Sequence, residues 1–152
     1  SAIVGLALSQ PGRGAIFLTN FAYHATAAFT SMYYPETVYE KISAQGKIEP
    51  GSIDMIKYLG IHNLSTATLC LVRLYYLYQT ERPSSTTDAF LDVITLVPLV
   101  SIHVTSMFTS YFSTARTGRW TLGHGLDWVT LSNTLFSVVD LVALGGRLLT
   151  LY

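Results

Sequence analysis

Charged side chains are scarce in this chain of 152 residues. Asp, Glu, Lys and Arg make up 12% of it and hydrophobic residues 50%, whereas roughly a quarter of a soluble domain is charged. Nine basic residues balance nine acidic ones, so no net charge attracts nucleic acid, and we expect no nucleic-acid partner. The composition points to lipid instead.

Cysteine and the common catalytic motifs are also nearly absent. Cys70 is the single cysteine, which excludes an intramolecular disulfide and a zinc site built on cysteines. The sequence contains no Walker loop, no G-x-G-x-x-G, no H-E-x-x-H and no G-x-S-x-G. We therefore predict neither a nucleotide cofactor nor a metal site.

Four long apolar segments account for most of the chain. They cover about residues 14–34, 53–80, 87–113 and 125–152, each long enough to cross a hydrocarbon core about 30 Å thick. A soluble four-helix bundle would need a charged face on every helix, and residues 14–34 contain no Asp, Glu, Lys or Arg. We predict a single all-α domain, a four-transmembrane-helix bundle, that is multi-pass in the membrane (the endoplasmic reticulum if the source is eukaryotic).

Two shorter stretches lie outside these spans. "PETVYEKISAQG" starts with Pro35, ends in glycine and places Val38 and Ile42 four residues apart, which predicts a short amphipathic surface helix after the first span. "AIVGLAL" near the start is too short to span a bilayer and lacks a charged flank, so we do not interpret it as a signal peptide. Four spans would place both termini on one side.

The polar residues inside the second and third spans repeat one interval. His62 and Arg73 are eleven residues apart, as are Asp92 and His103, and at about 100° per residue each pair shares a helix face. If the two spans form an antiparallel hairpin, His62 lies level with His103 and Arg73 level with Asp92. The interval predicts a polar-lined interior.

Polar residues of the other spans extend this interior into a column. Asn133, Asp140 and Arg147 are spaced seven apart on one stripe, and His24 lies near mid-depth of the first span. We predict Arg73, Asp92 and Arg147, with Asp88 as a further candidate, at one end of the column. The other end would contain His62, Asn63, His103 and Asn133, with His24 and Asp140 between the two groups.

Several roles are open for these residues. Arg73 and Asp92 form either a structural ion pair or a ligand-anchoring pair, and Arg147 either joins them or reaches the interface. His62 and His103 either hydrogen-bond between helices, act as acid and base, or hold a metal or haem. Pro98, inside the third span, is expected to kink that helix and widen a cavity.

The run "SMYYPETVYEKI", followed by "SIDMIKYLGIHNLSTATLCL", is similar to the DoxX-like family of small four-helix membrane proteins. The resemblance implies a first span ending in proline, a surface helix, and a second span that opens with a polar patch, here Gly60 to Asn63. Many relatives carry arginine where His62 stands, so a role tied to that arginine does not transfer. The family includes quinone-linked oxidoreductase subunits and tailoring proteins of secondary metabolism.

The leading hypothesis is a membrane enzyme that binds a lipophilic, terpenoid- or polyketide-like molecule between its helices and isomerises or cyclises it by cofactor-independent acid/base chemistry. Asp92 or Asp140 would transfer a proton, His62 and His103 would form the complementary pair, and Arg73 would stabilise an oxyanion. The candidate substrate-binding residues are His24, Asn63, Asn133, Tyr58 and Tyr76. The alternatives are a quinone- or haem-binding redox subunit and a non-catalytic subunit of a homo-oligomer or larger membrane complex.

Overall fold

A computed structural model describes residues 2–43, 48–79, 85–117 and 127–151 of the chain. The described elements are α1 (Ala2–Leu8), α2 (Gln10–Tyr33), α3 (Pro35–Ile42), α4 (Pro50–Leu77), α5 (Ser85–Phe108), the π-helical segment η1 (Thr109–Thr114), α6 (Ala115–Thr117) and α7 (Trp128–Leu148). No strand occurs among these residues, and the all-α prediction is confirmed.

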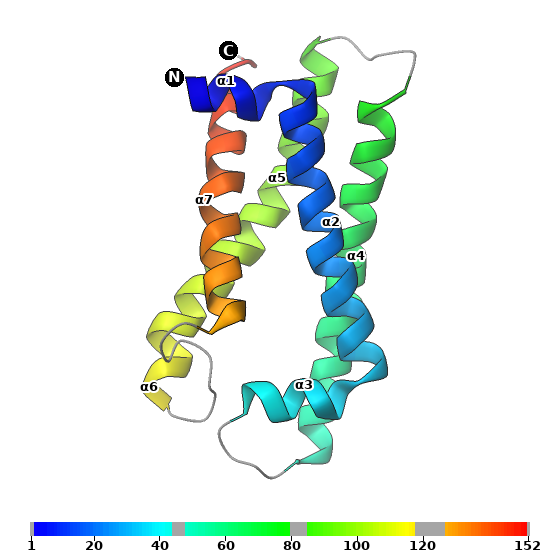
Figure 1. Ribbon diagram of the computed structural model, residues 1–152, viewed down its shortest axis with the longest axis vertical. Helices are drawn as coiled ribbons and strands as arrows, with labels where there is room; N and C mark the ends of the chain where they lie inside the picture. The colour runs from blue at the N-terminus through cyan, green and yellow to red at the C-terminus, as the bar shows by residue number, and fades with distance from the viewer. Residues whose placement is uncertain (1, 44–47, 80–84, 118–126, 152) are drawn as a thin grey trace.

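Four long helices run antiparallel along the length of the molecule. Figure 1 shows α2 and α5 descending, α4 and α7 ascending, and both termini at the same end. The short helix α1 lies across that end and α3 lies across the opposite end, so the predicted helix after the first long segment is confirmed at Pro35–Ile42. Among the described residues, two helices are long and apolar enough to cross a membrane, Ser85–Phe112 and Trp128–Leu148.

Helix α2 begins earlier than the sequence predicts. The stretch "SQPGRG" looks like a connector because it contains a proline and two glycines. Instead Ser9 caps the helix, since its hydroxyl accepts a hydrogen bond from the amide of Gly12, and Pro11 occupies the first turn, where its missing N–H costs nothing. Arg13 therefore lies on a helix, where it can point into the bundle.

The long helices associate as two pairs. α2 packs along α4 and α5 packs along α7, while α4 and α5 contact each other much less. Gly60 permits the close approach of the first pair, because a Cβ there would lie 2.8 Å from Cγ of Met32 and 3.3 Å from the carbonyl oxygen of Ala28. Although α4 and α5 follow each other in the sequence, α4 packs mainly on α2 and α5 mainly on α7.

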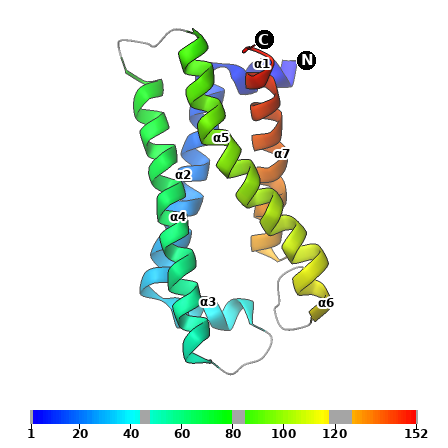
Figure 2. The same ribbon diagram turned by 180° about the vertical axis from the view of Figure 1, so that it is seen from behind.

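The apolar core fills only the half of the bundle nearest the termini. Its buried members come from all four long helices and are Ile16, Phe17, Cys70, Leu77, Leu96, Leu99 and Ala143. Beyond this core, Figure 2 shows α5 inclining away from α4 toward α6. Pro98 lies inside α5 and cannot donate a hydrogen bond to the carbonyl of Ile94, which frees the backbone to bend as the sequence predicts.

Candidate functional site

A buried ionic cluster ties the four long helices together at the terminus end. Asp92 of α5 is fully buried and accepts hydrogen bonds from Nε of Arg73 at 2.7 Å and Nη1 of Arg13 at 2.8 Å. Nε of Arg147 lies 2.7 Å from the same carboxylate as an ion pair. The predicted pairing of Arg73 with Asp92 is confirmed, and Arg147 joins the pair rather than the interface.

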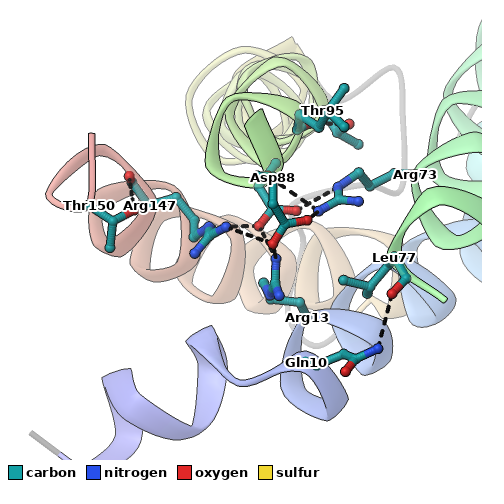
Figure 3. A network of polar contacts seen from close by, with 10 residues as sticks. Gln10, Arg13, Arg73, Leu77, Asp88, Thr95, Arg147 and Thr150 are labelled. Carbon is teal, nitrogen blue, oxygen red and sulfur yellow. Dashed lines mark hydrogen bonds and ion pairs between the residues drawn. The ribbon is translucent and has the colours of Figure 1, made fainter. Parts of the chain in front are cut away.

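Asp88, one turn before Asp92, contacts the same three arginines. Figure 3 shows the side chains of Arg13, Arg73 and Arg147 approaching the Asp88 carboxylate from three helices. Burial lowers the pKa of the Arg13 guanidinium, but its hydrogen bonds to Asp92 and Asp88 outweigh that effect, so this pKa lies above its ordinary value.

Arg13 is the member of the cluster that the sequence interpretation does not include, because it lies in the stretch "SQPGRG", which resembles a connector. The signal that could have found it is the cap before it, Ser9 followed by Pro11, which is typical of a helix start. With Arg13 included, each of α2, α4, α5 and α7 contributes at least one charged side chain to the cluster.

The ionic cluster does not line the cavity of the bundle described below. Its guanidiniums and carboxylates mostly neutralise one another, and Arg73 and Asp92 are at most 2% exposed. Asp92 and Arg73 do not line this cavity, and their catalytic roles stay predictions. Their position favours the structural alternative, an ion pair that fixes helix register.

A second buried polar group lies deeper in the bundle. Nδ1 of His103 is 2.9 Å from Oδ2 of Asp140, and the amide of Asn20 donates to Oδ1 of the same carboxylate at 3.1 Å. All three residues are fully buried. The sequence places Asp140 between the two ends of the polar column, whereas the structure places it in direct contact with His103.

His24 stacks on this group and connects it to α4. The rings of His24 and His103 are 5.1 Å apart and nearly parallel. Nδ1 of His24 lies 2.7 Å from Oδ1 of Asn63, and the amide nitrogen of Asn63 donates to the carbonyl of Leu59 at 2.8 Å. Since Asn63 thereby presents its oxygen, Nδ1 of His24 carries the proton and Nε2 carries the lone pair.

Both histidines keep Nε2 without a hydrogen-bond partner in the protein. For His103 the carboxylate of Asp140 can only accept, so Nδ1 again carries the proton. Buried polar atoms without a partner are uncommon and often mark a site of function. Two imidazoles with the same tautomer and the same unsatisfied nitrogen thus meet at the centre of the bundle.

A cavity of about 1270 Å³ occupies the half of the bundle that the apolar core leaves unfilled. Residues of α2, α3, α4, α5, η1 and the start of α7 form its wall, which is mostly apolar. Four predicted site residues lie on this wall: His24, His62, Asn63 and Asn133. The volume exceeds the roughly 300–1,000 Å³ of ordinary small-molecule pockets, so a sizeable lipophilic molecule fits.

His62 and His103, predicted to lie at one level, have different ring neighbours in the structure. His62 is exposed at the cavity rim, where its ring meets Tyr58 edge-on at 4.6 Å, and the His103 ring lies between His24 and Phe136. The buried stripe of α4, which includes Ala67 and Cys70, faces α2 and turns His62 outward. These two histidines therefore do not frame a haem.

The two tyrosines expected to bind substrate also lie outside the cavity. Tyr58 and Tyr76 are both exposed and neither belongs to the cavity wall. Tyr23 was not among the predicted site residues, yet it lines the cavity and contacts the rings of His24 and His103 edge-on. The signal for it was its position beside His24 in a segment without charge.

Metal ligands do not gather in the part of the chain that the structure describes, since no three His, Cys, Asp or Glu side chains there are placed to hold an ion. Comparison with protein-family models, curated proteins and solved structures finds no match to this chain. The resemblance to the DoxX-like family thus stays a prediction, and function has to be argued from the site itself.

Proposed function

We propose that all four long helices span a membrane. The described charges support this arrangement: within residues 14–33, 58–77, 89–108 and 128–148, every Asp, Glu, Lys and Arg is buried. Large apolar side chains point outward from each of the four helices, for example Phe29, Leu64, Phe90 and Leu135. Ionic groups inside and apolar groups outside are expected of a protein whose solvent is lipid.

We further propose that the protein is a small membrane enzyme that binds a lipophilic molecule in the cavity and moves a proton on it. One observation carries this proposal, namely that His24 lines the cavity with a fixed tautomer and an unpartnered Nε2. A neutral imidazole held in this way can act as a general base on a substrate carbon or hydroxyl.

The neighbours of His24 support a transient positive charge on its ring. Oδ1 of Asn63 accepts the Nδ1 proton in the neutral and in the protonated form. The Asp140 carboxylate lies behind the stacked His103 ring and attracts an imidazolium on His24. These residues hold and orient the base, and the apolar wall excludes water from it.

The reaction that this site supports best is an isomerisation. His24 removes a proton from an acidic carbon next to a carbonyl or an alkene, and the imidazolium, whose proton can exchange with solvent, returns a proton to another carbon of the substrate. One C–H bond breaks and one forms, so the reaction needs no oxidant, reductant or co-reactant. A terpenoid- or polyketide-like enone has the required acidity and lipophilicity.

The test uses hydrogen exchange, because reversible removal of a carbon-bound proton incorporates solvent deuterium. The purified protein is incubated with β-ionone, a lipophilic enone, in deuterated buffer, and deuterium uptake is followed by mass spectrometry. We expect His24→Gln to slow the catalysed exchange by about 10²–10⁴-fold, the usual contribution of a general base, while binding of β-ionone persists.

His62→Gln is the matched control, because it makes the same substitution at an exposed histidine of the same cavity. We expect it to retain exchange within a few-fold of the wild type. Wild-type protein without exchange above background, or His24→Gln with full exchange, would reject His24 as the base.

A further inference from the structure

The cavity opens sideways, between α4 and α5. Both helices contribute residues to the cavity wall that are also exposed on the outer surface. Leu59 and His62 form the α4 edge of this opening, and Ser101, Ile102 and Thr105 form the α5 edge. Here α4 and α5 contact each other sparingly and diverge beyond the core, as Figure 2 shows. The cavity also reaches exposed wall residues on α2 and α7, for example Thr26 and Val129, but the candidate route of entry is the side between α4 and α5.

This opening faces the proposed hydrocarbon layer rather than water. Its α5 edge lies within Ser85–Phe112, a helix apolar enough to cross a membrane. The nearest exposed charge on α4 is Lys57, two residues before Leu59, and no exposed charge follows it as far as Leu77. A molecule dissolved in the bilayer would pass these edges without meeting a charged side chain.

The described cavity wall also selects against positive charge. It includes Lys41 and the imidazoles of His24 and His62, but no Asp or Glu. The nearby Asp140 does not line the cavity, because His103 and Asn20 enclose it. A cation in this apolar space would contact no carboxylate of the described wall, and burying a charge without a partner in contact is strongly unfavourable.

We infer that the cavity takes up a neutral or anionic lipophilic molecule directly from the bilayer, through the opening between α4 and α5. This inference rests on the proposed function, since it names the substrate class and the route of entry for the same site. It excludes quaternary ammonium and other cationic amphiphiles as substrates.

Cysteine labelling in lipid nanodiscs tests the route of entry. Thr105→Cys places a thiol at the α5 edge, and the native Cys70 is fully buried, so its background reaction, measured with the wild type, is low. A neutral lipophilic maleimide should label Thr105→Cys at least about tenfold faster than a charged, membrane-impermeant thiosulfonate, because only the first partitions into lipid. Equal rates would overturn entry from the bilayer and leave binding in the cavity intact.

Protection by three matched probes tests the charge selection. 1-Dodecanol, dodecanoate and dodecyltrimethylammonium are added at equal mole fraction in the bilayer. The neutral and anionic probes should slow labelling of Thr105→Cys several-fold, and the cationic probe should not. Equal protection by the cation would overturn the selection, and no protection by any probe would overturn both this inference and binding in the cavity.

Two control variants separate these outcomes from general effects of the bilayer. Leu135→Cys is exposed on α7 away from the cavity and should be labelled regardless of the probe. Glu36→Cys, exposed on α3, should react with the charged reagent. His24→Gln combined with Thr105→Cys should be protected as before, because binding does not require the base. Wild-type protein that is protected by the probes but shows no deuterium exchange would reject the proposed chemistry and leave the route of entry intact.

Discussion

Replacing Asp92 with asparagine should destabilise the fold more than any other conservative change in the ionic cluster. Asp92 is fully buried and lies within 2.8 Å of nitrogen atoms from Arg13, Arg73 and Arg147. The substitution would keep the shape of the side chain but remove its charge. Three guanidiniums would then face the single carboxylate of Asp88.

The expected loss follows from the cost of stranding buried charge. Breaking a buried ion pair by removing one partner costs about 3–5 kcal/mol, a large part of the roughly 5–15 kcal/mol that holds a typical domain folded. For a chain of this size each kcal/mol lowers the melting temperature by about 2–4 °C. We therefore expect the melting temperature of Asp92→Asn to fall by roughly 6–20 °C.

The assay is thermal unfolding of the detergent-solubilised protein, followed by far-ultraviolet circular dichroism. Asp88→Asn is the matched control: its side chain is 20% exposed, so water solvates the stranded arginines and the loss should be smaller. Adding Arg147→Met to Asp92→Asn removes one stranded charge and should restore part of the stability. If Asp92→Asn melted within 2 °C or about 1 kcal/mol of the wild type, the cluster would not be holding the helices together.

Three further substitutions test the packing and the helix start. Gly60→Ala should cost about 1–3 kcal/mol because its Cβ would meet Met32 at 2.8 Å, whereas Gly145→Ala, with nothing within 4 Å, should be neutral or stabilise α7 by up to about 1 kcal/mol. Equal effects of these two would contradict close packing of α2 on α4. Ser9→Ala should cost about 1 kcal/mol because the amide of Gly12 loses its acceptor, and an unchanged melting temperature would argue against the helix start at Gln10.

The fold class and one contact of the site could be predicted from the sequence alone. Long apolar segments separated by helix breakers predict long helices, and both termini at one end follow from an even number of them. The eleven-residue intervals place Arg73 beside Asp92 because a helix returns to nearly the same face after eleven residues. The predicted contact between Arg73 and Asp92 is confirmed, because a charged side chain inside a bundle needs a partner of opposite charge at the same level.

The pairing of the helices could not be predicted in the same way. Both faces of α4 are largely apolar, so periodicity does not reveal which face is buried. The choice depends on where backbones can approach closely, as they do at Gly60. Because α4 turns that face toward α2, His62 moves to the rim and His24 takes the central position beside His103. Packing between segments that are far apart in the sequence therefore decides which face of α4 is buried.

If the four long helices span a membrane, as proposed above, the ionic cluster also has a consequence for the order in which they can be assembled there. Its charges are distributed along the chain so that Arg13 and Arg73 are synthesised first, the two aspartates of α5 next, and Arg147 last. A single arginine at the centre of a bilayer costs about 2.5–3.5 kcal/mol on insertion scales. The cluster lies toward one end of the bundle, where this cost is smaller, but Arg13 and Arg73 still lack the α5 carboxylates while α2 and α4 are inserted without α5. They gain their neutralising carboxylates only when α5 arrives, so biogenesis couples the early helices to a segment that is translated after them.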